Sequence, residues 1–168
     1  CAMQRVTVDS VIIAALLTGS LPQFMLPTLQ GARVLEIGCG RGLAGIVAGH
    51  CGASVVVQTD CDDRPLAELH QMDLMNSEAN NCGSNGTSFL LRHHLWEQDE
   101  AMEEAKNAST SDVPPSKIRH WSDSYRNEDF LELSAEDGAF DLLLASGCLY
   151  FQSQEPPLAA VLRQRVKK

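Results

Sequence analysis

The segment with the clearest chemical meaning carries three alternating glycines, Gly38, Gly40 and Gly42, with the carboxylate of Glu36 two positions before them. Glycine tolerates positive φ angles and lets a ligand approach the backbone closely. The dinucleotide-binding fingerprint would place its third glycine at position 43, where this chain has Leu43. A carboxylate beside the turn also disfavours a pyrophosphate and suits a cationic ligand. The spacing therefore predicts a binding turn for a small molecule that carries positive charge.

Two further residues are predicted to belong to this site. Cys39 lies between two of the glycines; its backbone N–H is expected to contact the ligand, and its thiol is assigned no chemistry. Asp60 follows the next apolar segment, about 20 residues after the turn, where an acid typically accepts hydrogen bonds from ribose hydroxyls. NAD enzymes use the same arrangement, and a plain helix N-cap is the alternative role for Asp60. This acid alone therefore does not identify the ligand.

The elements that hold these residues follow from the apolar pattern. Arg33–Ile37 is predicted to be a buried strand, Leu43–His50 a helix, and 54–59 a second buried strand. Such a βαβ unit implies a parallel pair of strands with a right-handed crossover. The alternation of elements along the whole chain predicts an α/β protein with a doubly wound, mostly parallel sheet. The other expected elements are a helix capped by Asp9 and Ser10, helices over 62–76 and 154–168, and strands over 88–95 and 140–145.

We expect one domain over 1–168 that carries a surface insertion. Residues 97–115 are acidic and close with two prolines, which predicts an inserted helix and linker. The acidic run 97–104 is expected to be a solvated helical face. His93 and His94 have no partners at metal-ligand spacing, so both are expected at the surface or the edge of the sheet, and no metal site is predicted.

Composition narrows the function classes. The 168 residues are 44% apolar and 21% charged, which suits one globular domain. Lysine and arginine number 13 against 22 aspartates and glutamates, so the formal net charge is -9. This balance argues against a nucleic-acid binder that relies on a basic surface and fits a basic partner better. No apolar run reaches the roughly 20 residues of a membrane span, so no membrane association is expected.

The six cysteines indicate a reducing compartment. None of them forms a C-x-x-C pair, which disfavours a zinc site, and the chain is not cysteine-dense enough for a disulfide scaffold. Reduced cysteines in a cytoplasmic or nuclear protein are the simplest interpretation. No catalytic residue is assigned.

Two parts of the chain resemble a known family. The segment 34–48 is similar to motif I of class I methyltransferases, and its form over 40–46 resembles the seven-strand protein lysine and histidine methyltransferases in particular. The segment 140–150, with Ser146 and Tyr150, resembles the fourth strand of that group. The resemblance implies a Rossmann-like sheet and S-adenosylmethionine as cofactor, with S-adenosylhomocysteine as product. It also implies further strands beyond the end of this chain, so the sheet is expected to lack its C-terminal strands.

The resemblance assigns roles outside the glycine turn. A tryptophan after the third strand would lie beside the adenine; Trp121 has the more family-like surroundings, and Trp96 is the alternative. Ser146 is predicted on the cofactor side. Tyr150 is predicted on the substrate side, with a structural role nearly as well supported. The family usually carries an acid where this chain has Gly147, so the chain departs from the family at the target side.

Two short segments favour the histidine branch of that family. Residues 7–9 resemble the segment before its first helix, with Val6 in place of a cysteine, and 120–123 resemble its Trp-Ser segment. The resemblance then implies a protein substrate, basic or ribosomal. A neutral histidine needs no strong base before methyl transfer, whereas a lysine must first lose a proton from a group with a pKa of about 10.4.

Three functions are therefore compared. A protein methyltransferase that acts on histidine or lysine is favoured. A small-molecule or nucleic-acid methyltransferase comes second; the acidic charge disfavours nucleic acid, and no N/D-P-P-Y/F tetrapeptide follows the fourth strand. A non-catalytic interaction module with a degenerate methyltransferase fold comes third, favoured by Gly147 and by the expected lack of strands. Affinity for the cofactor separates this module from the enzymes.

Overall fold

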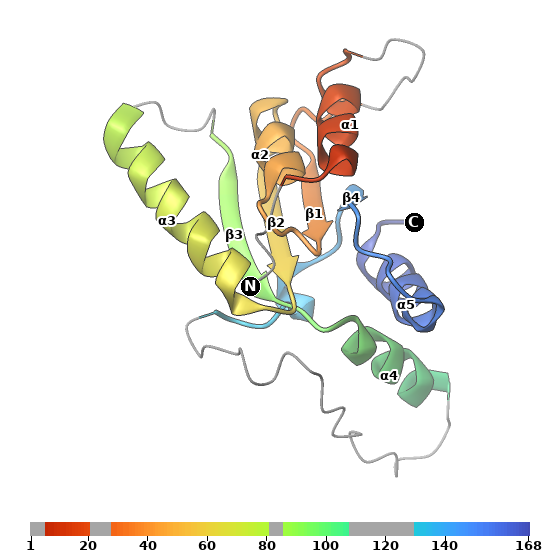
Figure 1. The fold of residues 1–168 in the computed structure, drawn as a ribbon. Coiled ribbons are helices and arrows are strands. Elements are labelled where there is room, and N and C mark those ends of the chain that lie inside the picture. Colours follow the sequence, from red (N-terminus) through yellow and green to blue (C-terminus); the bar gives the residue numbers. More distant parts are fainter. Residues whose placement is uncertain (1–5, 21–27, 81–85, 108–129) are drawn as a thin grey trace.

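The computed structural model describes residues 6–20, 28–80, 86–107 and 130–168 (Figure 1). Among these residues no helix is long and apolar enough to cross a membrane. The sheet contains β1 (Arg33–Ile37), β2 (Val55–Asp60), β3 (Ser88–His93) and β4 (Leu142–Ala145). The α-helices of the described ranges are α1 (Val8–Leu17), α2 (Leu43–His50), α3 (Asp63–Asn80), α4 (Trp96–Asn107) and α5 (Glu155–Arg165). Two short 3-10 helices, η2 (Ala135–Asp137) and η3 (Gln152–Gln154), flank β4.

The sheet has the strand order β3-β2-β1-β4, and every neighbouring pair is parallel. The chain moves outward from β1 to β2 and β3, and then returns to place β4 on the other side of β1. Ile37 pairs with Thr59 of β2 and with Ala145 of β4, so the carboxyl ends of these strands lie level. The strand order reverses between β1 and β4, and ligands of open α/β sheets bind outside the carboxyl ends at such a point.

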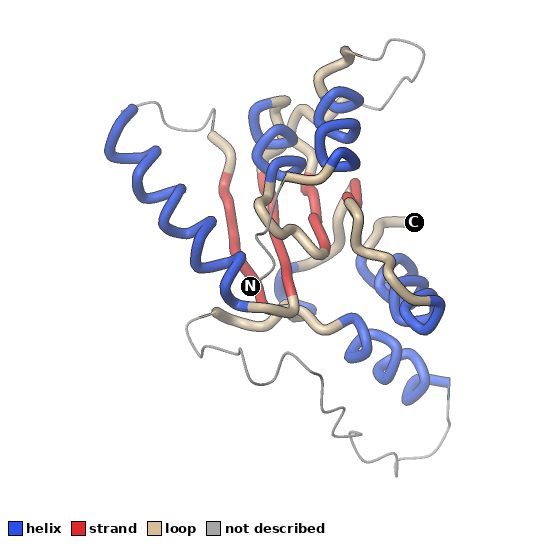
Figure 2. Tube along the Cα trace, viewed as in Figure 1, coloured by secondary structure: helices blue, strands red, loops and turns tan. Residues whose placement is uncertain are grey.

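Helices cover both faces of the sheet (Figure 2). Successive side chains of a strand point to opposite faces, so an apolar strand contributes to two cores. On one face α1 and α2 pack over Val34 and Val56. On the other face α5 packs over the alternate residues of β1 and β2, and this cluster contains Leu35, Ile37, Val57, Phe140 and Val161. This arrangement confirms the predicted α/β, doubly wound parallel sheet.

β1 and α2 match the predicted bounds at both ends, and the other predicted strands and helices differ from theirs by a few residues. The prediction that Asp9 and Ser10 cap the first helix is wrong. The N-cap is Thr7, whose Oγ1 accepts a hydrogen bond from the Ser10 N–H at 3.2 Å. β4 is shorter than predicted, because Phe140 leaves the ladder and its N–H donates to the Arg165 carbonyl at 2.8 Å.

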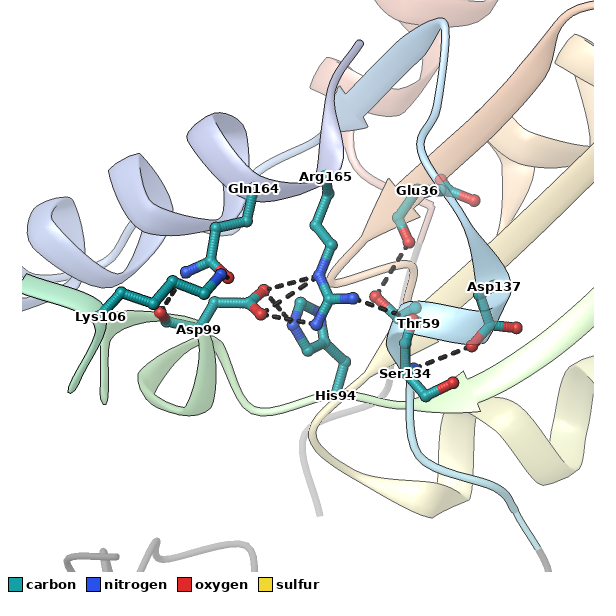
Figure 3. Close-up of polar contacts among 9 residues, drawn as sticks. All are labelled: Glu36, Thr59, His94, Asp99, Lys106, Ser134, Asp137, Gln164 and Arg165. Atoms are coloured by element: carbon teal, nitrogen blue, oxygen red, sulfur yellow. Dashed lines mark hydrogen bonds and ion pairs between the residues drawn. The ribbon is translucent and has the colours of Figure 1, made fainter. Parts of the chain in front are cut away.

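His93 ends β3, which is an edge strand, so the expected edge position is right for this residue. A surface position is wrong for both histidines, since His93 and His94 are only 2% and 1% exposed. The chain around Leu131 runs beside the end of β3 and covers this end: the His93 N–H donates to the Leu131 carbonyl at 2.9 Å. The acidic run of α4 is not wholly solvated either. Asp99 is fully buried because Arg165 of α5, distant in sequence, supplies a matching cation (Figure 3).

α4 therefore does more than carry a solvated surface. It begins the segment predicted to be an insertion, and it packs against α5 (Figure 1). The remainder of that segment, 108–115, lies outside the described residues. The division of the chain into one domain with an insertion stays a prediction.

Candidate functional site

The turn after β1 is tied to the end of β2. Gly38, Gly40 and Gly42 have φ angles of 59°, 49° and 67°, all in the left-handed region. The Cys39 N–H donates to the Thr59 carbonyl at 2.8 Å, and the Gly42 N–H donates to the Cys39 carbonyl at 2.7 Å. The first bond ties the loop to β2 and the second closes a turn, so the backbone is fixed where β1 leads into α2.

The three glycines differ in what a side chain would meet. A Cβ on Gly38 would lie 2.9 Å from the Cβ of Cys148, and a Cβ on Gly42 would lie 2.5 Å from Nε2 of Gln58. A Cβ on Gly40 would meet nothing within 4 Å. Gly38 and Gly42 are therefore required by packing as well as by φ. Gly40 alone of the three turns its backbone toward open space, where a ligand can approach.

Glu36 lies beneath this turn and not at its open side. Its carboxylate is 1% exposed, and Oε2 accepts hydrogen bonds from the Gly45 N–H at 3.1 Å and from Nε2 of Gln58 at 2.7 Å. Gly42 offers α2 no side-chain cap, so Glu36 satisfies one of the free N–H groups of its first turn. Burial raises the pKa of Glu36 to about 7, although these hydrogen bonds oppose the shift. A direct contact between Glu36 and a cofactor stays a prediction.

Asp60 ends β2 and faces the turn from the other side. Its Oδ2 accepts a hydrogen bond from the Gly40 N–H at 3.1 Å, and its Oδ1 accepts one from the Asp62 N–H at 3.1 Å. Burial raises the pKa of Asp60, and the two hydrogen bonds oppose the shift. The cap of α3 comes from Asp62, whose Oδ1 accepts the Arg64 N–H at 3.0 Å. Asp60 is therefore not a plain helix cap, and its carboxylate lies beside the open glycine.

The loop after β4 forms the other side of the site. Ser146 Oγ lies 2.7 Å from Ser10 Oγ and 3.2 Å from Thr7 Oγ1, so it binds the first turn of α1. Cys148 packs against Gly38. The cofactor contact predicted for Ser146 stays a prediction, and in the structure its hydroxyl joins α1 to the end of β4.

Tyr150 lies on the same loop with 72% of its surface exposed. Its backbone N–H donates to Oε1 of Gln154 at 2.7 Å, which holds the loop against the start of η3. Partial burial of the phenol raises the pKa of Tyr150, and the charges of neighbouring groups, Asp60 and Asp9 among them, add to this. The phenol is therefore within electrostatic reach of both the cofactor side and α1.

The two tryptophans have different outcomes. Trp121 lies outside the described residues, so its place beside the adenine stays a prediction. Trp96 is the first residue of α4, and its Cζ2 lies 3.9 Å from the position of a Cβ on Gly38. Trp96 was the alternative to Trp121 for the position beside the adenine, and the structure shows that Trp96 reaches the glycine turn.

A buried polar cluster that sequence analysis missed holds α4 in this position (Figure 3). Asp99 accepts hydrogen bonds from Nε2 of His94 at 3.0 Å and from the Arg165 guanidinium at 2.6 Å. Burial alone would raise the pKa of Asp99, but these two partners outweigh it and the pKa is lowered. A histidine and an acid five residues apart gave a weak signal, and the arginine could not be assigned to them before the helices were placed.

Comparison with known proteins supports the fold. No protein-family profile and no curated protein matches the chain. Protein arginine methyltransferase 10 of Arabidopsis thaliana superposes with a TM-score of 0.51 at 13% identity, over 98% of this chain and 34% of that one. A proposed S-adenosylmethionine-dependent methyltransferase from Listeria monocytogenes gives 0.47 at 18% identity, over 92% and 51% of the two chains. PKMT2 from Rickettsia typhi, in complex with AdoHcy, gives 0.46 at 17% identity, over 96% and 23%.

The first of these similarities shows that the chain shares its α/β, Rossmann-like fold with a methyltransferase. The chain spans 34% of the length of that arginine methyltransferase. At this level of identity the likeness concerns the fold alone, and the function has to be argued from the site.

Proposed function

We propose that the chain forms the cofactor-binding part of an S-adenosylmethionine-dependent methyltransferase that modifies a protein side chain. The observation that carries the proposal is the environment of Gly40. Its backbone faces open space at the carboxyl ends of the strands, and its N–H is held by the half-buried carboxylate of Asp60. A small polar ligand with hydroxyl groups fits such a position.

The charges around the turn fit this cofactor better than a dinucleotide. S-adenosylmethionine carries a sulfonium and an ammonium group and no phosphate. The carboxylates of Glu36 and Asp60 lie beneath and beside the turn. Arg41 is the one cation within the turn, and its guanidinium pairs with Glu68 of α3. A pyrophosphate at the open side would therefore lie beside the Asp60 carboxylate and find the nearby arginine already paired.

The residues of the chain would bind and orient the reactants. Asp60 would accept hydrogen bonds from ribose hydroxyls, and the backbone at Gly40 would line the cofactor. The bound sulfonium supplies an activated methyl group and a good leaving group. The protein then has mainly to align a nucleophile with this group and exclude water. Tyr150, exposed on the loop after β4, would contact the incoming side chain.

A protein target, histidine or lysine, is the finer part of the proposal. The family resemblance supports it, with a lean toward histidine and a basic or ribosomal substrate. The net charge of -9 favours association with a basic partner. A cytoplasmic or nuclear location follows from the reduced cysteines that we expect. A small-molecule methyltransferase and a non-catalytic module remain the alternatives.

The test is isothermal titration of S-adenosylhomocysteine into the folded chain and two glycine variants. Gly40→Trp fills the open space at the turn. Gly31→Trp is the matched control, because Gly31 also has a positive φ and open space at its Cβ. Gly31 precedes β1, so it lies at the amino end of that strand and away from the turn. We expect binding in the wild type and in Gly31→Trp and none in Gly40→Trp. A folded wild-type chain that binds no S-adenosylhomocysteine would refute the proposal, and equal loss in both variants would refute the placement at Gly40.

A further inference from the structure

The carboxylate of Asp9, in α1, lies close to Gly147 in the loop that follows β4. Oδ2 of Asp9 is 3.2 Å from the position of a Cβ on Gly147, and Gly147 has a φ of 58°. The same Cβ would lie 3.7 Å from the Thr7 side chain. The first turn of α1 therefore approaches this loop closely, and glycine at position 147 leaves room for the Asp9 carboxylate.

Hydrogen bonds among three hydroxyl groups fix this approach. Ser10 Oγ lies 2.9 Å from Thr7 Oγ1 and 2.7 Å from Ser146 Oγ, and Thr7 Oγ1 lies 3.2 Å from Ser146 Oγ. Thr7 is also the N-cap of α1. The position of Asp9 at the carboxyl end of β4 is thus set by the helix cap and by the loop that follows the strand.

The Asp9 carboxylate is available to a ligand. It is exposed, and among the residues that the structure describes it has neither an ion pair nor a hydrogen bond from a side chain.

We infer that Asp9 is a specificity-determining residue that binds a basic side-chain nitrogen of the substrate beside Gly147. The inference rests on the proposed function and names the chemistry of its target side. An imidazole that donates one N–H to Asp9 keeps its other nitrogen unprotonated and free to act as a nucleophile. An ammonium group at the same place is held in its charged form, so a lysine would be recognised there and not activated.

The test follows backbone amides of the isotope-labelled chain by NMR during titration with small probes. The probes are methylimidazole and n-butylammonium, which carry basic nitrogens, and n-butanol, which does not. We expect saturable shifts at Gly147 and Ser10 with a nitrogen probe and none with n-butanol. In Asp9→Asn the apparent affinity should fall about 5-fold, a modest factor because exposed charge pairs are weak. Asp9→Glu should restore part of the affinity, which a purely structural role would not predict.

Glu136→Gln is the matched control, because it also removes an exposed carboxylate from the first turn of a helix, here η2. Gly138, the C-cap of η2, lies near Arg33 at the start of β1, so this carboxylate is at the opposite end of the strands from Gly147. Equal affinities in Asp9→Asn and the wild type, or equal shifts with n-butanol, would overturn the inference. Titration with S-adenosylhomocysteine, followed at the Gly40 amide, tests the proposed function separately. If the wild-type chain binds a nitrogen probe but its Gly40 amide does not respond to S-adenosylhomocysteine, the proposed function alone is refuted. Tighter binding of methylimidazole would indicate a histidine substrate, and tighter binding of n-butylammonium a lysine substrate.

Discussion

Glu36 makes the stability of this protein depend on pH in a predictable direction. Its carboxylate is 1% exposed, and burial raises its pKa from 4.5 to about 7 despite hydrogen bonds from Gln58 and Gly45. An acid with a higher pKa in the folded state favours folding while it is protonated. Its contribution is complete below pH 4.5 and is lost as the pH rises through about 7.

The size of the effect follows from the two pKa values. At about 1.4 kcal/mol per pKa unit, the difference between 4.5 and about 7 amounts to about 3 kcal/mol. Glu36→Gln keeps the shape of the protonated carboxyl group and cannot ionise. We expect the unfolding free energy of this variant, minus that of the wild type, to rise by about 3 kcal/mol as the pH goes from below 4.5 to above 7.

Urea denaturation at a series of pH values, followed by circular dichroism, measures this difference. The slope against urea has to be the same for both proteins, so that the free energies are comparable. Glu136→Gln, which removes an exposed carboxylate, should show no such dependence. A difference between Glu36→Gln and the wild type that stays flat with pH would refute the reasoning. It would mean that Glu36 ionises in the folded protein without cost, and that the Gly45 and Gln58 hydrogen bonds fully offset burial.

Three further substitutions test the packing around the site. Asp99→Asn leaves the Arg165 guanidinium buried without its carboxylate, so we expect urea denaturation to show a loss of about 3–5 kcal/mol; an unchanged midpoint would show that the cluster is not needed for folding. Gly42→Ala meets both a positive φ and a contact of 2.5 Å with a neighbouring side chain, so it should destabilise more than Gly31→Ala. The latter carries only the φ cost of roughly 1–2 kcal/mol, and equal losses would contradict the packing argument. Thr7→Ala removes the N-cap of α1 and should cost about 1 kcal/mol in thermal unfolding, whereas no change would mean that the cap adds nothing.

The part of the fold nearest the glycine turn was predictable because local patterns determine it. The β-branched run of β2 and the glycines before α2 specify a βαβ unit from adjacent residues. The alternation of strands and helices then gave the parallel sheet. The bounds of β4 were less predictable, because Phe140 exchanges its place in the ladder for a bond to the Arg165 carbonyl, a contact that depends on tertiary packing.

The features that sequence analysis missed all join distant segments. His94 was expected at the surface or the edge of the sheet, and Asp99 on a solvated helical face. Nothing in the sequence indicated that Arg165 would meet them in the interior. The approach of Asp9 to Gly147 likewise depends on how α1 lies against the end of β4. The sequence identifies residues whose side chains could take part in binding or catalysis. Only the packing of the helices shows which of these residues share a site.

The pairing of β1 with a near strand and a distant one has a consequence for the order of folding. Its partner β2 follows after a single short helix, whereas β4 lies beyond α3, β3 and α4. The entropic cost of loop closure grows only logarithmically, by about 0.6 kcal/mol for each doubling of length, so extra residues between β3 and β4 are tolerated. Contacts between distant segments nevertheless form slowly. We therefore expect the glycine turn and Asp60 to assemble first, as a local nucleus, and the loop that carries Gly147 to join it in a later step.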